Sequence, residues 1–362
     1  MTNHGGDVWR VAEEFGIPAT DLIDFSANIN PRGLPEAARR RLVRDAANPH
    51  LLSLYPDPAA STLRRALAEK FAVSADSIVV GPGAEALLSP ILRTIAPRRA
   101  LIPIPAFSEY RRVCEVEEIT AEPFPLRRAD LFRLPAAQFC EAIEPTDVVF
   151  LNFPHNPTGT CLDRPEAEMI HRATIAKNAT LLLDEAFVDY VPESSLIREA
   201  SAQSRIIVLR SLTKFYGCPA LRVGYAVADP ETIRRVRSRL PTWPITQLAL
   251  DAMLDATGDR DYEKESLQEN RIERDRLAND LSSVGFFVFP SAANYLLLEL
   301  AEDMPRASEL RQWLITNRRI LIRNCDSYEG LAHGRYVRVA VRNREENCGL
   351  AEALAAAIRN IG

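Results

Sequence analysis

Six short and nearly continuous apolar runs dominate the first two thirds of this 362-residue chain. Runs of this length and composition are typical of strands that are buried on both faces of a sheet. Several intervals between them, such as 84–96 and 165–178, carry apolar residues at helical spacing. The pattern therefore predicts an α/β domain with a mainly parallel sheet. The runs are IVVG (78–81), ALIPI (100–104), DVVFLN (147–152), ATLLLD (179–184), RIIVLR (205–210) and VGYAVA (223–228).

The charge content and the hydrophobic pattern of the chain change after about residue 245. Residues 260–284 have the pattern of a long charged helix with a narrow apolar stripe, which we expect to lead out of the large domain. Apolar runs at 286–290, 293–300, 319–323 and 335–342 then alternate with helical patterns at 306–318 and 345–361. We therefore expect an N-terminal segment (1–45) that packs on the small domain, a large α/β domain (46–258) and a small C-terminal α+β domain (259–362).

Charge and composition exclude several classes of function. The 44 basic and 49 acidic residues give a formal net charge of −5, and no block of Lys and Arg provides the basic surface that nucleic acids require. No apolar run approaches the ~18 residues of a membrane span, and the first twenty residues lack the apolar core of an export signal. We expect a cytoplasmic protein with a small-molecule substrate and with neither a nucleic acid nor a membrane as partner. The five histidines and six cysteines are dispersed, so we expect no metal site.

Only four of the basic residues are lysines, and one of them stands out. Lys214 lies just past the buried run 205–210, at the edge where open α/β sheets bind ligands. Ser211, Thr213 and Arg222 flank it, which is the layout expected of an imine-forming amine beside a phosphate group. A surface lysine in a loop fits the same spacing equally well. Lys70, Lys177 and Lys264 lie in charged helical patterns and are interpreted as solvated.

Two further polar residues follow buried runs. Asp184 ends the run 179–184, where an unpaired carboxylate is costly to bury, so it needs a cationic partner or caps the next segment. Asn156 lies in a Pro-flanked turn after 147–152 and can donate to a ligand oxygen, although the strand end also explains the turn. A Gly-rich turn opens a helix with the N–H groups of Ala84 and Glu85 available to a phosphate, but this signal alone is weak.

The motifs NPTG (156–159), DEAF (184–187), SLTK (211–214) and RVG (222–224), in this order and spacing, resemble the fold-type I pyridoxal-phosphate enzymes. The resemblance covers essentially the whole chain and lies closest to the histidinol-phosphate aminotransferase branch of the class I and II aminotransferases. HGG (4–6), DFSANINPRG (24–33) and YPDP (55–58) are similar to motifs of the threonine-phosphate decarboxylase family of cobalamin biosynthesis. The resemblance implies a large domain with a mainly parallel seven-stranded sheet, a small α+β C-terminal domain, and pyridoxal 5'-phosphate as cofactor.

The resemblance also implies roles for individual residues. Lys214 would form the imine with the cofactor, Asp184 would pair with its pyridine nitrogen, Asn156 would bind its ring hydroxyl, and Phe107 would stack on its ring. The cofactor phosphate would lie against Ala84, Glu85, Ser211, Thr213 and Arg222, and Tyr55 would reach in from the neighbouring subunit of a homodimer. The implied substrate-binding residues are Arg338, for the α-carboxylate, His4, Gly5, Gly6 and Arg323, near the substrate phosphate, and Asn30.

The residues support the substrate assignment independently of the resemblance. Period-two alternation places Arg338 and Arg342 on one face of the run 335–342, and cations on an apolar strand need anions. A guanidinium can bind a carboxylate or a phosphate in bidentate fashion, but an ion pair with an acidic side chain is the alternative. We favour the ion pair for Arg342 and a ligand for Arg323 and Arg338.

The chain departs from the aminotransferases at Phe187, where many relatives have a tyrosine that donates to the ring oxygen. The decarboxylases resemble this chain in having phenylalanine there. The reaction that the resemblance implies is decarboxylation of O-phospho-L-threonine to (R)-1-amino-2-propanol O-2-phosphate. A histidinol-phosphate-type aminotransferase is the alternative, and a catalytically silent regulator is far less favoured because the chain has no basic surface. A preference for threonine phosphate over serine phosphate stays open.

Overall fold

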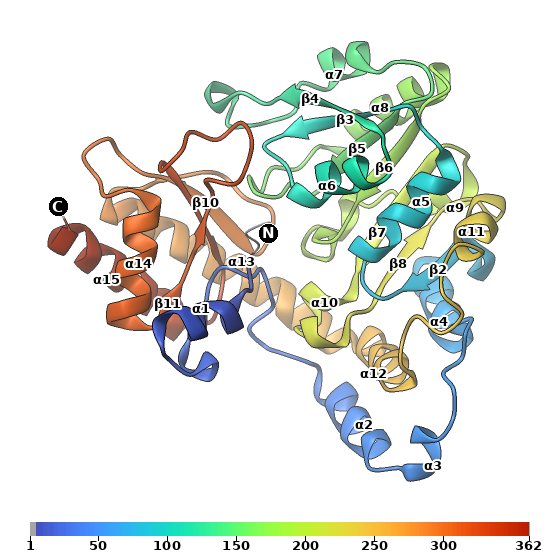
Figure 1. Ribbon diagram of the computed structural model, residues 1–362, viewed down its shortest axis with the longest axis horizontal. Coiled ribbons are helices and arrows are strands. Elements are labelled where there is room, and N and C mark those ends of the chain that lie inside the picture. Colours follow the sequence, from blue (N-terminus) through green and yellow to red (C-terminus); the bar gives the residue numbers. More distant parts are fainter. Residues whose placement is uncertain (1–4, 362) are drawn as a thin grey trace.

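The computed structural model describes residues 5–361 and is built around a seven-stranded sheet (Figure 1). The strand order is β2-β8-β7-β6-β5-β3-β4, and only β8 runs antiparallel to its neighbours. The mainly parallel seven-stranded sheet predicted from the sequence is therefore confirmed. The strands are β2 (Ile78–Gly81), β3 (Arg99–Ile104), β4 (Thr120–Pro125), β5 (Val148–Asn152), β6 (Thr180–Asp184), β7 (Ile206–Ser211) and β8 (Gly224–Val227).

The edge strand β4 has no counterpart among the six apolar runs. Its sequence, TAEPFP, contains two prolines, which cannot donate to a neighbouring strand and are accommodated most easily at a sheet edge. No residue of β4 is fully buried, so the strand lacks the continuous apolar pattern of the others. The central strands can be recognised in the sequence as continuous apolar runs, whereas this edge strand cannot.

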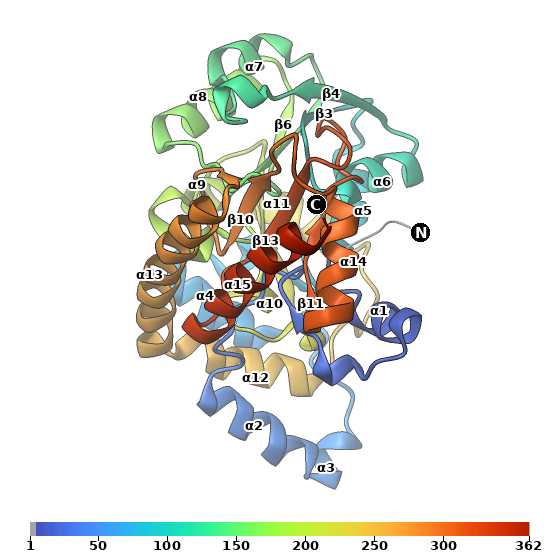
Figure 2. The ribbon, with the colours of Figure 1, turned by 90° about the vertical axis from the view of Figure 1, so that its left-hand side faces the viewer.

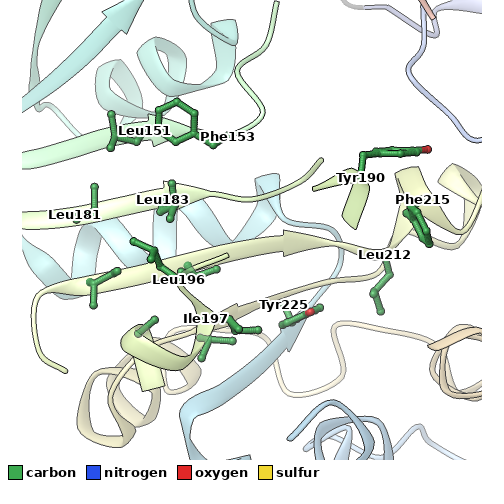
Figure 3. Close-up of a cluster of buried hydrophobic side chains, with 14 of the residues drawn as sticks. Leu151, Phe153, Leu181, Leu183, Tyr190, Leu196, Ile197, Leu212, Phe215 and Tyr225 are labelled. Atoms are coloured by element: carbon green, nitrogen blue, oxygen red, sulfur yellow. The ribbon is translucent and has the colours of Figure 1, made fainter. Parts of the chain in front are cut away.

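Alternate residues of the central strands supply two separate cores, one on each face of the sheet. Leu181 and Leu183 belong to one cluster and Leu182 to the other, and all three are fully buried. Figure 3 shows part of the first cluster, including Leu151 from the neighbouring strand. The helices of this domain are α4 (Ser61–Phe71), α5 (Leu88–Ile95), α6 (Ser108–Val116), α7 (Ala136–Ala142), α8 (Arg164–Ala176), α9 (Ile197–Ala202), α10 (Leu212–Phe215), α11 (Pro230–Arg237) and α12 (Gln247–Gly258).

The 25-residue helix α13 (Arg260–Val284) leads to the small domain and has the bounds expected from the sequence. Asp259 caps its first turn by accepting from the Tyr262 N–H, and Gly285 ends it with φ 109°. A four-stranded sheet of order β12-β13-β10-β9 follows, with helices packed on it (Figure 2). Its elements are β9 (Phe287–Val288), β10 (Tyr295–Glu299), α14 (Ala307–Arg318), β12 (Arg323–Asn324), β13 (Tyr336–Ala340) and α15 (Arg344–Ile361).

The N-terminal segment divides between the two domains. α1 (Val8–Phe15) packs against Ile315 of α14, and β1 (Ile23–Asp24) pairs with β11 (Ile320–Leu321), as expected for packing on the small domain. The expectation is wrong for α2 (Glu36–Ala46), which packs against α12, and α3 (Pro49–Leu52) follows it. The reason is that α2 buries Ala38 in the core cluster of the large domain. No helix within residues 5–361 is long and apolar enough to cross a bilayer.

Candidate active site

The carboxyl ends of β5, β6 and β7 meet at one edge of the large sheet, where parallel α/β folds bind ligands. Asn152 lies opposite Asp184 in the β5–β6 pair, and β7 leads directly into α10, which carries Lys214. A cavity of about 310 Å³ opens there between the two domains. Nine of the expected site residues line it: Gly5, Glu85, Phe107, Asn156, Asp184, Lys214, Arg222, Arg323 and Arg338.

Lys214 is the lysine that lines this cavity. Burial, together with the nearby cations Arg338 and Arg222, lowers the pKa of its ammonium group to about 8. The neighbouring carboxylate of Asp184 acts in the opposite direction but does not restore the ordinary value. An amine with a lowered pKa is partly neutral near pH 7 to 8, which is the form that can attack a carbonyl group.

This lowered pKa predicts how cofactor-free protein captures pyridoxal 5'-phosphate. The capture rate should rise with pH as the Lys214 ammonium loses its proton and should level off above about pH 8. An unperturbed lysine, with a pKa of about 10.4, would keep the rate rising to about pH 10. Stopped-flow absorbance at the wavelength of the bound cofactor measures the profile. A rate that still rises between pH 9 and pH 10 would contradict the assigned environment of Lys214.

Two of the remaining lysines are not solvated as the sequence suggested. Lys70 donates to the Tyr216 hydroxyl at 3.1 Å, to the carbonyl oxygen of Thr257 at 3.1 Å, and to the Glu263 carboxylate. Lys177 donates to three carbonyl oxygens at the end of α7, which satisfies groups that the helix itself leaves unpaired. Because the amines of Lys70 and Lys177 are bound by other groups, Lys214 is the better candidate for the imine-forming lysine.

Asp184 is held by a partner that the sequence did not indicate. The Tyr110 hydroxyl, from α6, donates to Asp184 Oδ2 at 2.6 Å, and the Ala186 N–H donates to Oδ1 at 2.9 Å. Burial raises the pKa of the Asp184 carboxyl group, and these two hydrogen bonds lower it. The contact joins residues 74 positions apart, so only the fold reveals it. The carboxylate faces the cavity, where it can pair with a protonated ring nitrogen.

Asn156 has its side-chain amide oriented by its neighbours. Its Oδ1 accepts from Arg338 Nη1 and from the Tyr328 hydroxyl, which lies 3.2 Å away. This leaves the Nδ2 hydrogens for a ligand oxygen. Asn152, which the sequence analysis missed, accepts from the Asn156 N–H at 2.8 Å and donates to the carbonyl oxygen of Asp184 at 2.8 Å, so it ties the two site residues together.

The expected phosphate-binding segments meet around a close backbone approach. Gly224 pairs with Ser211 in the β7–β8 ladder, and a Cβ on Gly224 would lie 2.4 Å from the Ala84 nitrogen. The hydroxyl oxygens of Ser211 and Thr213 are 2.7 Å apart. Arg222 projects into the cavity from the next turn. Backbone N–H groups, hydroxyls and a guanidinium are donors that suit a phosphate, but Ala84, Ser211 and Thr213 do not line the cavity as Arg222 does.

Glu85 and Phe107 also line the cavity, with different surroundings. The Glu85 carboxylate lies 3.2 Å from Arg112, so its side chain is paired, and its backbone N–H is the group that we expected to bind a phosphate. The Phe107 ring stands edge-on to Tyr110, with centroids 5.6 Å apart. Phe187 is buried against Tyr295 and presents its ring to the cavity, where it offers no hydrogen-bond donor.

Arg323 and Arg338 form the opposite wall and face each other directly across the β12–β13 pair. Both side chains are about 95% buried, and the Nε atom of each has no partner within residues 5–361. Arg323 donates to the Ser327 hydroxyl at 2.8 Å, and Arg338 donates to the carbonyl oxygen of Ser26 at 2.8 Å. Their hydrogen-bond partners in this part of the chain are thus neutral. Like charges placed opposite each other are unfavourable unless an anion joins them.

The glycines expected near the substrate phosphate lie against Ser26. Gly5 lies where a Cβ would be 2.1 Å from the Ser26 oxygen, and the Gly6 N–H donates to Ser26 Oγ at 2.8 Å. His4 lies outside the described residues. Arg342 forms the ion pair that we favoured for it, 2.9 Å from Glu346.

Asn30 does not line the cavity, contrary to our expectation. Its Nδ2 donates to the Phe215 carbonyl at 2.8 Å and to Ser266 Oγ at 2.9 Å, because the chain turns between residues 27 and 33. The structure places Asn28 in the cavity instead, with its buried Oδ1 lacking a partner among the described residues. The sequence motif does not show which of the two asparagines, Asn28 or Asn30, faces the cavity.

Tyr55 lies away from the cavity of its own chain. Its side chain is 78% exposed and stacks on Trp243, with ring centroids 4.4 Å apart. A large exposed aromatic pair of this kind is unusual on a free surface.

The cavity fits pyridoxal 5'-phosphate on the chemistry of its donors. The Lys214 amine with its lowered pKa, the buried Asp184 carboxylate held by Tyr110, the Asn156 amide, Glu85 of the Gly-rich turn and Arg222 line one space. Lys214 would hold the cofactor covalently, Asp184 would pair with its ring nitrogen, and Asn156 would bind its ring oxygen. Arg323 and Arg338 are then left with their unpaired Nε atoms for a second, anionic ligand.

Comparisons with known proteins agree with this geometry. Residues 20–354 match the family model described as aminotransferase class I and II. The chain is 38% identical to a threonine-phosphate decarboxylase of Salmonella typhimurium over 363 residues, covering 99% of this chain and 96% of the relative.

Two solved structures share the whole architecture. L-threonine-O-3-phosphate decarboxylase from Porphyromonas gingivalis superimposes with a TM-score of 0.81 at 25% identity, over 93% of this chain and 99% of that one. Histidinol-phosphate aminotransferase from Clostridium acetobutylicum gives a TM-score of 0.86 at 26% identity, over 94% and 100%.

Proposed function

The chain belongs to the class I and II aminotransferase family, and we propose that it decarboxylates O-phospho-L-threonine to (R)-1-amino-2-propanol O-2-phosphate. It is a pyridoxal 5'-phosphate-dependent enzyme, as is typical of this family. The product is a building block of cobalamin, so the relatives of this chain support a place in cobalamin biosynthesis.

The observation that carries the proposal is the pair of opposed arginines. Arg323 and Arg338 face each other in register, both are buried, and their hydrogen-bond partners within residues 5–361 are neutral oxygens. A ligand with two anionic groups neutralises such a pair, and O-phospho-L-threonine has a carboxylate and a phosphate. Arg222 also lines the cavity and would supply a separate cation for the cofactor phosphate.

We propose a task in the reaction for each of three residues. When bound, pyridoxal 5'-phosphate accepts the electrons of the bond that breaks at the substrate Cα. The Asp184 carboxylate would pair with the ring nitrogen and keep it protonated, and Arg338 would bind the substrate carboxylate and so orient the bond that breaks. Lys214 lines the cavity, and its amine would be available to return a proton to the substrate Cα after CO₂ leaves.

The test is to incubate the holoenzyme with O-phospho-L-threonine, with and without 2-oxoglutarate, and to measure released CO₂ and glutamate together. CO₂ released without any keto acid establishes the decarboxylase. Glutamate that forms only with 2-oxoglutarate, without CO₂, refutes the proposal. A parallel reaction with O-phospho-L-serine measures how strongly the substrate methyl group is selected, a difference that one pocket can set by about 1 to 3 kcal/mol.

A histidinol-phosphate-type aminotransferase is the second candidate, since such an enzyme shares the fold at a TM-score of 0.86. It would use the same Lys214, Asp184 and Asn156. Phe187 argues against it, because the side chain lines the cavity without the hydroxyl that many aminotransferases have at this position. Formation of glutamate from histidinol phosphate and 2-oxoglutarate would favour this candidate.

We also propose that the active enzyme is a homodimer in which Tyr55 completes the site of the neighbouring subunit. Tyr55, Leu52, Leu54 and Trp243 are all exposed, and Tyr55 does not line the cavity of its own chain. Large exposed apolar side chains that lie together in this way are typical of a protein interface. A second copy of the chain is the partner that the resemblance implies for this surface.

Mixed dimers test the role of Tyr55. Subunits with Tyr55→Ala and subunits with Lys214→Ala should each be nearly inactive alone. Hybrid dimers contain one intact site if Tyr55 acts across the interface, so random mixing should restore about a quarter of wild-type activity in a symmetric dimer. Activity is measured after co-refolding equal amounts of the two variants. If mixing restores nothing, Tyr55 does not act in the partner's site.

A further inference from the structure

One residue that the mechanism has not used, Tyr328, contacts three residues of the cavity. Its buried hydroxyl donates to Asn156 Oδ1 at 3.2 Å and accepts from Arg338 Nη1 at 3.1 Å. The Arg323 guanidinium lies over its ring, 5.4 Å from the centroid. A single side chain therefore joins the residue that binds the cofactor oxygen to both residues that bind the substrate anions.

The segment that carries Tyr328 has a fixed shape. It connects β12 to β13, and the Tyr328 N–H donates to the Cys325 carbonyl at 3.0 Å. The Gly334 N–H donates to Asp326 Oδ1 at 2.5 Å, which closes the far end of the segment, and the Leu331 N–H donates to the Tyr328 carbonyl at 3.3 Å. These bonds hold the backbone, so the Tyr328 side chain is presented to the cavity in one direction.

The contact also crosses from the small domain to the large one. Asn156 follows β5 of the large domain, whereas Tyr328 and Arg338 belong to the small domain. A second contact across the same boundary joins Glu329 to Arg111 of α6, but both side chains are about half exposed. Exposed ion pairs contribute little to stability, so the buried hydrogen bond of Tyr328 is the firmer of the two links.

The hydrogen-bond pattern defines what the hydroxyl does. Asn156 Oδ1 has two donors, Arg338 and Tyr328. An anion that binds Arg338 competes for the guanidinium hydrogens, whereas the neutral Tyr328 hydroxyl keeps its bond to Asn156. The amide of Asn156 therefore stays turned with Nδ2 toward the cavity while the substrate enters.

We propose that Tyr328 is a positioning residue that fixes Arg338 and Asn156 relative to each other, so that the anionic group of the substrate and the cofactor ring oxygen are held in one geometry. The inference rests on the proposed function, because it takes the ligand of Arg338 to be an anionic group of a phosphorylated amino acid. Tyr328 acts through these two residues and need not touch the reacting atoms.

Calorimetry with cofactor-free protein tests the proposal without any reaction. The ligand is O-phospho-L-threonine, and the proteins are the wild type, Tyr328→Phe and the matched control Tyr336→Phe. The Tyr336 hydroxyl donates to Glu299 at 2.9 Å and does not line the cavity. Loss of two hydrogen bonds at Tyr328 should weaken binding about tenfold, while Tyr336→Phe should bind as the wild type does.

The outcomes separate the two hypotheses. A wild-type holoenzyme that releases no CO₂ from O-phospho-L-threonine overturns the proposed function. If the cofactor-free wild type does not bind the ligand, the absorbance midpoint and KM of the holoenzyme variants decide the inference. A wild type that binds, together with a Tyr328→Phe variant of equal affinity, overturns the inference alone. The melting temperature of each variant shows whether a loss of affinity comes from a loss of folding, since Phe keeps the buried ring and its contact with Arg323.

The holoenzyme provides a spectroscopic readout. In Tyr328→Phe the Asn156 amide loses one of its two donors and is oriented less well. It should then donate a weaker hydrogen bond to the cofactor ring oxygen, which disfavours the anionic form of that oxygen. The pH midpoint of the visible absorbance band should therefore move upward in Tyr328→Phe and stay in place in Tyr336→Phe. KM for O-phospho-L-threonine should rise by a larger factor than kcat falls. An unchanged midpoint in Tyr328→Phe would contradict the positioning role.

Discussion

Replacing Lys214 by alanine should remove the visible absorbance band of the holoenzyme and lower CO₂ release from O-phospho-L-threonine by about 10⁴-fold. Lys214 is the lysine that lines the cavity, and its lowered pKa, about 8, makes its amine available for bond formation. Without this amine the chain can neither hold the cofactor covalently nor return a proton to the substrate Cα from this position. Absorbance spectra and a CO₂ assay on the purified variant measure both effects.

The other lysines supply the matched control for this experiment. Lys264→Ala removes an exposed lysine, so it should leave both the absorbance band and the activity unchanged. Borohydride treatment of the wild type should add the mass of the cofactor to the peptide that contains Lys214 and to no other. A Lys214→Ala protein that stays yellow would refute the assignment, and so would labelling at Lys70 or Lys177.

Replacing Asp184 by asparagine should have the second largest effect, a fall in kcat of about 10³-fold. The variant keeps the shape of the side chain but loses the charge that keeps the cofactor ring nitrogen protonated. Asparagine can still accept from the Ala186 N–H, and its amide can donate to the Tyr110 oxygen, so the local hydrogen bonds survive. The defect should therefore appear in kcat, with a small effect on the affinity for the cofactor. Activity within tenfold of the wild type would contradict the role of Asp184.

The same substitution should stabilise the cofactor-free protein. Burial raises the pKa of Asp184 in the folded state above its ordinary value, so the ionised carboxylate lowers the free energy of unfolding at neutral pH. Below the ordinary Asp pKa of about 3.9 the carboxyl group is protonated in both states, and the difference between Asp and Asn disappears. The melting temperature of cofactor-free Asp184→Asn should exceed that of the wild type at pH 7 and match it near pH 3.5. A lower melting temperature at pH 7 would show that the pocket requires the charge.

These predictions also explain the arrangement of the site. Lys214 and Asp184 both carry charges that are costly to bury, and the cofactor provides a partner for each. Arg323 and Arg338 are costly for the same reason, and the substrate provides theirs. We therefore expect stability to rise stepwise as cofactor and then O-phospho-L-threonine bind, since a ligand stabilises the state to which it binds.

The sequence alone determined the sheet and the main site residues. Strands β5, β6 and β7 are buried on both faces, so their sequences are nearly continuous apolar runs, and parallel strands bring their carboxyl ends to one edge. Asn156, Asp184 and Lys214 follow those ends and meet in the cavity for this reason. Period-two alternation likewise placed Arg338 on the face of β13 opposite Val337 and Val339, which belong to the small-domain core.

Only the tertiary structure decided which side chains support these residues. Tyr110 and Asp184 are 74 positions apart, Tyr328 and Asn156 are 172 apart, and no local period links either pair. A turn of the backbone decides that Asn28, and not Asn30, lines the cavity. The ion pair between Lys70 and Glu263 forms because α13 begins close to Lys70. A sequence pattern reports which face of its own segment is buried, whereas these contacts arise from the relative placement of segments that the pattern does not describe.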